Sequence, residues 1–363
     1  MRNLFFLFSF LTVSLLQAQT KQFSVVEYHP APGQFVNLLP EAEEGTTHAE
    51  ICRRCEELLE DESVVHLGTF GGYITVQFHQ PVPNLLGSDL RILGNSSYAM
   101  NDPAFGKETI GGSFEPGIVY VGVGDDVETA QWYELAGSEY YKSEIHDFQV
   151  TYHRPTSESG KHEQSFSSYD EYIRWEATWM ENGVRRDSTG YHIKNTFHKQ
   201  SYWPLWEEGE AITLRGGRLP NNGVDYSGKG TNWVLYRYAA DAYGYVDASL
   251  NTDPYSTFDI DWAVDRHGRP VQLSEINFVR VVNAMFQYCG WIGETSTEVG
   301  NFINLHQQPG YDQNPIIIQP DQETALHGTT LRKADTGMYD LTGRRITTPR
   351  RGIYIRNGKL VTY

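Results

Sequence analysis

The sequence predicts an all-β protein: a jelly-roll-like β-sandwich with an N-terminal helix and a small C-terminal β domain. Three observations support this prediction. Aromatic residues make up 13% of the 363 residues, the chain contains 34 Gly, and apolar residues alternate with polar ones over many short segments. Aromatic side chains favour strands, and short strands bounded by turns are typical of sandwiches and jelly rolls rather than of β-α-β units.

The segment 258–282 is expected to form the central hairpin of this sandwich. In its first part apolar residues alternate with Asp259 and Asp261, which predicts a single strand with both carboxylates on one face. A turn ending at Gly268 follows. The nearly continuous apolar run over 278–282 is typical of a strand that is buried on both faces.

The same alternation predicts the other strands. They cover residues 64–68, 73–78, 89–93, 117–123, 132–135, 148–152, 213–220 and 233–238. Residues 170–182 fit a helix or a strand. The β-sandwich domain is therefore expected over residues 64–313.

One helix is predicted over residues 47–61, within an N-terminal segment that spans 19–63. Thr47 and Glu50 have the spacing of a capping box, and apolar residues follow at helical spacing. The preceding residues 19–45 contain several prolines and are expected to be irregular.

Residues 1–18 have the features of a secretory signal peptide. Arg2 precedes an apolar stretch that is too short to span a bilayer. The mature chain is expected to be secreted or held at the outer-membrane cell surface, without a transmembrane segment. The net charge of −17 argues against nucleic acid as a partner.

The composition changes after a proline-containing linker over residues 314–330. Residues 331–363 contain eight basic and two acidic residues in an otherwise acidic chain. This shift predicts a separate C-terminal domain over 331–363.

The three cysteines are too few for a disulfide framework. Cys52 and Cys55 lie on the predicted helix, and no further soft ligands at close spacing complete a zinc site. We interpret them as packing residues. The sequence leaves open whether either of them pairs with Cys289.

The C-terminal domain resembles the sorting domains of proteins from the phylum Bacteroidetes. The segments GMYDLTGRR (337–345) and RGIYIRNGK (351–359) carry this resemblance. Such tails form a small β domain that is recognised by the type IX secretion machinery and is usually removed. The resemblance therefore implies that machinery as a partner and the cell surface or the exterior as the destination.

The body resembles a family of cell-surface proteins from the same phylum, over about residues 64–306. The matching motifs include LGTFGGY (67–73), EPGIV (115–119), WYELAGSE (132–139), LRGGRLP (214–220), FDIDWAVD (258–265) and GWIGETSTE (290–298). The resemblance implies nutrient capture at the outer membrane and, more weakly, a connection with corrinoid uptake. It supplies no catalytic residues.

The predicted ligand-binding surface is aromatic, since aromatic faces stack on sugar rings and on flat cofactors. Its candidate residues are Tyr202, Trp203, Trp206, Tyr243 and Tyr245. Pro204 lacks a backbone donor, so this stretch is expected to be a loop, where binding residues concentrate. The alternative is that these side chains pack in the core.

Calcium is the predicted cofactor, because carboxylate oxygens are the ligands it prefers. Its candidate ligands are Asp247, Asp259 and Asp261, and the alternative is a solvated strand face. The acids in the family-like motifs are interpreted as loop hydrogen-bond acceptors or calcium ligands rather than catalytic groups; these are Glu115, Glu134, Glu139, Glu294 and Glu298.

No standard catalytic motif is present in the sequence. The predicted function is non-catalytic capture of a small-molecule or glycan ligand, a glycan or a corrinoid-type nutrient. Two alternatives remain open: a carbohydrate-active hydrolase with paired carboxylates, and a structural component of the surface layer. A deep cleft with two facing carboxylates would favour the hydrolase, and a shallow aromatic platform would favour the binding protein.

Overall fold

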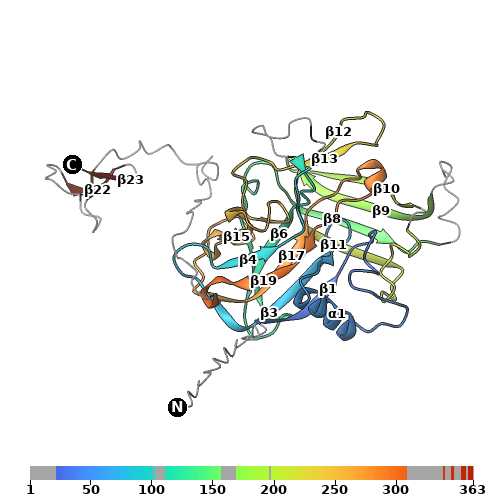
Figure 1. The fold of residues 1–363 in the computed structure, drawn as a ribbon, viewed down its shortest axis with the longest axis horizontal. Helices are drawn as coiled ribbons and strands as arrows, with labels where there is room; N and C mark the ends of the chain where they lie inside the picture. The colour runs from blue at the N-terminus through green and yellow to red at the C-terminus, as the bar shows by residue number, and fades with distance from the viewer. Residues whose placement is uncertain are drawn as a thin grey trace, which may run out of the picture. The chain divides into compact units, whose positions relative to one another are not determined.

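The computed structural model describes residues 22–100, 102, 111–156, 169–195 and 198–308, together with four short strands between residues 338 and 362. Strands account for 43% of the structure and helical segments for 9%. The predicted all-β, sandwich-like fold is therefore confirmed (Figure 1). The predicted signal peptide 1–18 and the linker 314–330 lie outside the described residues.

The largest sheet contains seven strands and forms one layer of the body. Its order is β1 (Phe23–His29), β3 (Tyr73–Pro83), β17 (Glu275–Asn283), β6 (Gly117–Val123), β7 (Gln131–Leu135) and β16 (Ala263–Val264), with β14 (Tyr245–Val246) also paired to β6. β17 lies between β3 and β6 and is antiparallel to both. The prediction of a central, doubly buried strand over 278–282 is confirmed.

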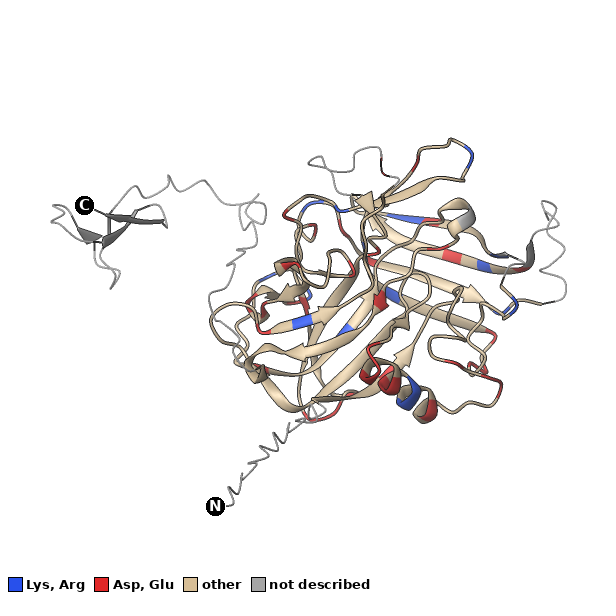
Figure 2. Ribbon diagram, viewed as in Figure 1, with Lys and Arg blue, Asp and Glu red and all other residues tan. Residues whose placement is uncertain are grey.

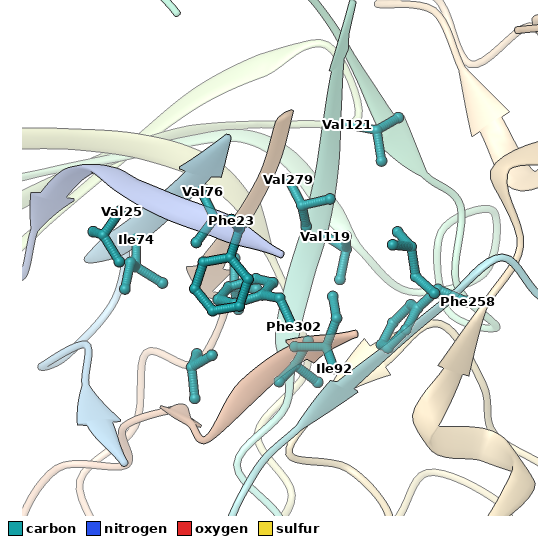
Figure 3. Packing of buried hydrophobic residues seen from close by; sticks show 14 of the residues in the cluster. Phe23, Val25, Ile74, Val76, Ile92, Val119, Val121, Phe258, Val279 and Phe302 are labelled. Carbon is teal, nitrogen blue, oxygen red and sulfur yellow. The ribbon is translucent and has the colours of Figure 1, made fainter. Parts of the chain in front are cut away.

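The main core lies between this sheet and a three-stranded sheet. The smaller sheet has the order β15 (Thr257–Phe258), β4 (Leu90–Leu93) and β19 (Asn301–Asn304). Phe23 of β1 meets Phe302 of β19 edge to face, with ring centroids 5.5 Å apart. Figure 3 shows Val119, Val279 and Ile92 in the same apolar cluster. Burial of this apolar surface holds the two sheets together.

The helix α1 (His48–Glu60) forms as predicted and packs against β1. The Thr47 side chain accepts a hydrogen bond from the backbone N–H of Glu50, which satisfies one free donor of the first turn. Cys52 and Cys55 are buried on its apolar face. All three cysteines are free thiols, so Cys289 pairs with neither of them, and the interpretation as packing residues is confirmed. Figure 2 shows acidic and basic residues along the helix.

A four-stranded sheet carries the second core cluster. Its order is β10 (Val184–Asn195), β9 (Tyr169–Glu181), β8 (Ile145–His153) and β11 (Ala211–Arg218). The ambiguous segment 170–182 is therefore a strand. Buried Phe148 and Tyr152 of β8 pack with Phe70 in this cluster.

Two further small sheets complete the body. One consists of β12 (Gly223–Asp225), β13 (Trp233–Tyr236) and β5 (Gly111–Gly112), and the other pairs β18 (Glu298–Val299) with β2 (Val65–His66). No helix within the described ranges has both the length and the apolar character needed to cross a membrane.

The structure corrects the single strand predicted at the start of the hairpin. β15 ends at Phe258, and a 3₁₀ turn over Ile260–Trp262 follows before β16. The Asp259 side chain accepts a hydrogen bond from the Asp261 N–H, which favours the turn over a continuous strand. The three alternating apolar residues are nevertheless buried.

Two other boundaries differ from the predictions. Residues 23–29, expected to be irregular, form the edge strand β1, because the prolines of that segment lie after the strand. β3 continues past Pro81 to Pro83, and a bulge between Gln77 and Val82 shifts its register with β17. A bulge and an edge position both tolerate the missing proline donor.

The residues beyond Pro320 form a second compact unit, Asp321–Tyr363, so the division falls within the predicted linker. Its antiparallel strands have the order β21 (Arg345–Ile346), β20 (Met338–Tyr339), β22 (Ile353–Arg356) and β23 (Lys359–Thr362). The unit is thus a small β sheet formed by the segments that carry the sorting-domain resemblance.

Candidate functional site

The segment 293–298 places an unusual number of polar side chains in the interior. It follows the 3₁₀ turn over Gly290–Ile292 and runs into β18. Glu294 is 2% exposed and Glu298 is 7% exposed, and the residues between them are buried as well. Burial of charged groups is costly unless they are paired and hydrogen-bonded. The partners of these two acids therefore define the candidate site.

His66 connects the two glutamates. The pairing of β18 with β2 places Glu298 opposite His66. The His66 Nδ1 lies 2.7 Å from Glu298 Oε1, and its Nε2 lies 3.6 Å from Glu294 Oε1. Burial alone lowers the pKa of His66, but the contacts with both glutamates outweigh it and raise the pKa to about 9. His66 is therefore an imidazolium at neutral pH.

His192 approaches Glu294 from the four-stranded sheet. Its Nε2 lies 3.7 Å from Glu294 Oε2. Burial lowers the pKa of His192, with a smaller opposing effect from Glu294, so this ring is neutral at pH 7. The Glu294 carboxylate also accepts a hydrogen bond from the Gln34 N–H. A charged and a neutral imidazole thus flank one carboxylate.

Three buried atoms of this group form no hydrogen bonds. Within the described part of the chain, His66 Nε2, His192 Nε2 and Glu294 Oε2 have no hydrogen-bond partner. The distances from His66 Nε2 to Glu294 Oε1, 3.6 Å, and from His192 Nε2 to Glu294 Oε2, 3.7 Å, are too long for hydrogen bonds. We call these three residues the His–Glu–His cluster. Its free donor and acceptor capacity suits polar atoms of a ligand.

The network continues through Glu298 to a group of three acids. Glu115, Asp247 and Glu298 each offer a carboxylate oxygen, and these oxygens lie within 4.8 Å of one another. Asp247 accepts hydrogen bonds from Ser96 Oγ at 2.6 Å and from the Glu298 N–H at 3.2 Å. Burial and the neighbouring carboxylates raise the pKa of Asp247 to about 8 and that of Glu115 well above its usual range. The carboxyl groups of Asp247 and Glu115 therefore hold protons at neutral pH.

Exposed aromatic rings border the His–Glu–His cluster. The ring of Phe35 meets the rings of His66 and His198 edge-on, with centroids 5.4 Å apart in both pairs. The ring of Tyr288 lies 6.5 Å from that of His192. Phe35 and Tyr288 are each 37% exposed. The buried cluster is thus next to a surface that carries aromatic side chains.

The structure places the residues of the predicted aromatic platform in or against the core. Tyr202 and Trp203 are buried in the second core cluster, and Tyr245 is buried in a third. Tyr243 is buried in the main core, and Trp206 packs against the same core. The stretch around Pro204 is a loop as predicted, but the Asn37 side chain binds the carbonyls of residues 201 and 203 and holds the loop against the body. Tyr202 still reaches the site, because its ring contacts those of His192 and His198.

The predicted calcium ligands are not brought together. Asp247 belongs to the acidic group with Glu115 and Glu298. Asp259 instead caps the 3₁₀ turn, and Asp261 accepts a hydrogen bond from the Asn84 side chain. Calcium itself stays a prediction.

Comparison of the sequence with protein-family models and with curated proteins found no match.

The acids Glu115, Glu294 and Glu298 were recognisable from their motifs, but the roles of His66, Phe35 and Tyr288 were not. The one local signal available was the polar run of the segment 293–298 between apolar flanks.

Proposed function

We propose that this chain is a secreted or cell-surface protein that captures a nutrient of the glycan or corrinoid type without transforming it. The observation that supports this proposal best is the His–Glu–His cluster beside the exposed rings of Phe35 and Tyr288. Aromatic faces bind the flat apolar surfaces of sugars and macrocycles. The buried imidazoles and the carboxylate offer donors and acceptors that fix the orientation of polar groups.

The charge pattern of the cluster favours binding over hydrolysis. Glycoside hydrolysis needs two carboxyl groups that flank the scissile bond across an open gap. Glu294 and Glu298 instead lie on either side of the His66 ring, and each forms an ion pair with one of its nitrogens. Contacts with the imidazoles keep the pKa of Glu294 below its usual value although burial alone would raise it, so Glu294 is a poor proton donor.

Truncation of the aromatic border tests the capture function. Tyr288→Ala and Phe35→Ala are each expected to weaken ligand binding by about 1–3 kcal/mol, which is roughly 5- to 150-fold in Kd. The measurement is a glycan array and a titration with cobalamin, using the full-length chain. The control is Leu86→Ala, which truncates another exposed apolar side chain, in the turn after β3, and should leave binding unchanged.

Three outcomes contradict the proposal. Release of shortened products from a bound glycan would favour the hydrolase. Absence of binding to every glycan and to cobalamin would favour a structural role. Binding that survives both aromatic truncations would place the ligand elsewhere on the chain.

We further propose that the C-terminal unit directs export through the type IX secretion machinery. Removal of residues 331–363 is expected to block delivery to the surface of a Bacteroidetes host. The body should stay folded, because the body is a compact unit without the C-terminal residues. Cell fractionation measures delivery, and thermal melting of the purified truncated chain measures folding. Surface delivery of the truncated chain would contradict the proposal.

A further inference from the structure

A second group of titratable side chains lies around β7, and the proposed capture function does not use it. Glu134 belongs to β7, opposite Tyr120 of β6. Glu144 immediately precedes β8, and His146 lies near the beginning of that strand. Each of the three residues offers one potential ligand atom, and these atoms lie within 4.8 Å of one another. We call them the Glu134 group.

The carboxylates of this group are buried with few partners. The Glu144 side chain is 0% exposed. Within the described residues, Glu134 Oε1 and both oxygens of Glu144 form no hydrogen bond of good geometry, and the side chains nearest to them are one another, Tyr120 and His146. No Lys or Arg of the described ranges forms an ion pair with either acid. Two neighbouring buried carboxylates therefore lack a fixed positive charge, which is costly.

His146 completes the group from the solvent side. Its Nδ1 lies 3.1 Å from Glu144 Oε1, and its side chain is 47% exposed. The ring of Tyr140 packs on the imidazole with centroids 4.5 Å apart, which helps to orient it. Two ligands bound to one tetrahedral ion at about 2.0–2.1 Å lie roughly 3.3 Å apart. The distance of 3.1 Å between His146 Nδ1 and Glu144 Oε1 is close to that value.

We propose that Glu134, Glu144 and His146 bind a divalent transition-metal ion of the Zn²⁺ type. A doubly charged cation neutralises the two carboxylates and gives their oxygens the partners that the protein does not supply. The imidazole ligand favours zinc and related ions over calcium, which prefers oxygen. Three protein ligands leave a fourth position for water or for a ligand atom. The exposed imidazole provides the entry path from solvent.

Metal analysis of the full-length chain tests this site. The chain is first stripped with a chelator, and it is then equilibrated with Zn²⁺, Mn²⁺ or Ca²⁺ in separate samples. We expect about one tightly bound Zn²⁺ per chain and a higher Tm with Zn²⁺, because an ion that binds the folded state stabilises it. Glu144→Gln and His146→Ala should each lower the Zn²⁺ affinity by at least about tenfold.

The control Glu128→Gln removes the same charge from an exposed acid in the loop before β7 and should keep the wild-type affinity. His146→Ala changes a half-exposed side chain, so its folding is secure even where Glu144→Gln perturbs the interior. Zn²⁺ binding that is equal in all variants would overturn the proposal, as would binding of Ca²⁺ alone. Absence of any metal effect would mean that the two carboxyl groups share a proton instead.

Discussion

Replacing Trp203 by alanine is expected to lower the free energy of unfolding by about 3–5 kcal/mol, the range for removing a buried aromatic side chain. Trp203 is 2% exposed and packs in the second core cluster. The guanidinium of Arg154 lies 5.2 Å from the centre of its ring. Alanine would leave a cavity that the surrounding sheet cannot close.

Urea denaturation of the full-length chain measures this effect. Met180→Ala is the control, since Met180 lies on β9 and is 54% exposed; its effect should stay within about 0.5 kcal/mol. A Trp203→Ala variant with unchanged stability and weaker ligand binding would restore the ligand-binding role predicted from the sequence. Tyr288→Ala should show the opposite pattern, with weaker binding and nearly unchanged stability.

The elements that local patterns specify were predictable from the sequence. The helix begins after Thr47 because the capping residue and the apolar spacing are both encoded within a few residues. The central strand β17 was recognisable because an apolar run buried on both faces has no polar alternation.

The direction of loop side chains was not predictable in the same way. Tyr202 and Trp203 lie in a loop, where no fixed period relates neighbouring side chains to one face. Their loop is held by Asn37, which is distant in the sequence and donates a hydrogen bond to the carbonyl of Trp203. The 3₁₀ turn after Phe258 was missed because its alternating apolar residues also fit a strand.

The candidate site was predictable in part. Motifs singled out Glu294 and Glu298, and the calcium prediction singled out Asp247. The histidine that joins the two glutamates is separated from Glu298 by 232 positions. It reaches Glu298 through the pairing of two strands of two residues each, which leaves no periodic signal in the sequence.

Replacing His66 by glutamine is expected to lower the free energy of unfolding by about 3–5 kcal/mol at pH 6, the cost of removing one partner from a buried ion pair. The variant leaves Glu294 and Glu298 buried without the imidazolium between them. His79→Gln is the matched control, because His79 is exposed. It should unfold like the wild type in urea at every pH.

The effect of His66→Gln is expected to depend on pH with a defined sign. The pKa of His66 is about 9 in the folded chain, where the contacts with both glutamates outweigh burial, and about 6.5 in the unfolded chain. The folded state therefore binds the proton more tightly, and this stabilisation is fully present below pH 6.5 and is lost as the pH rises through 9. The difference corresponds to roughly 3 kcal/mol. The raised pKa of Asp247 adds a separate loss of stability as the pH rises between about 4 and 8, so the wild type and the variant are compared above pH 6.5, where His66 titrates. The stability difference between wild type and His66→Gln should thus shrink from pH 6.5 to pH 9, and a difference that stays constant over this interval would show that His66 is neutral in the folded protein.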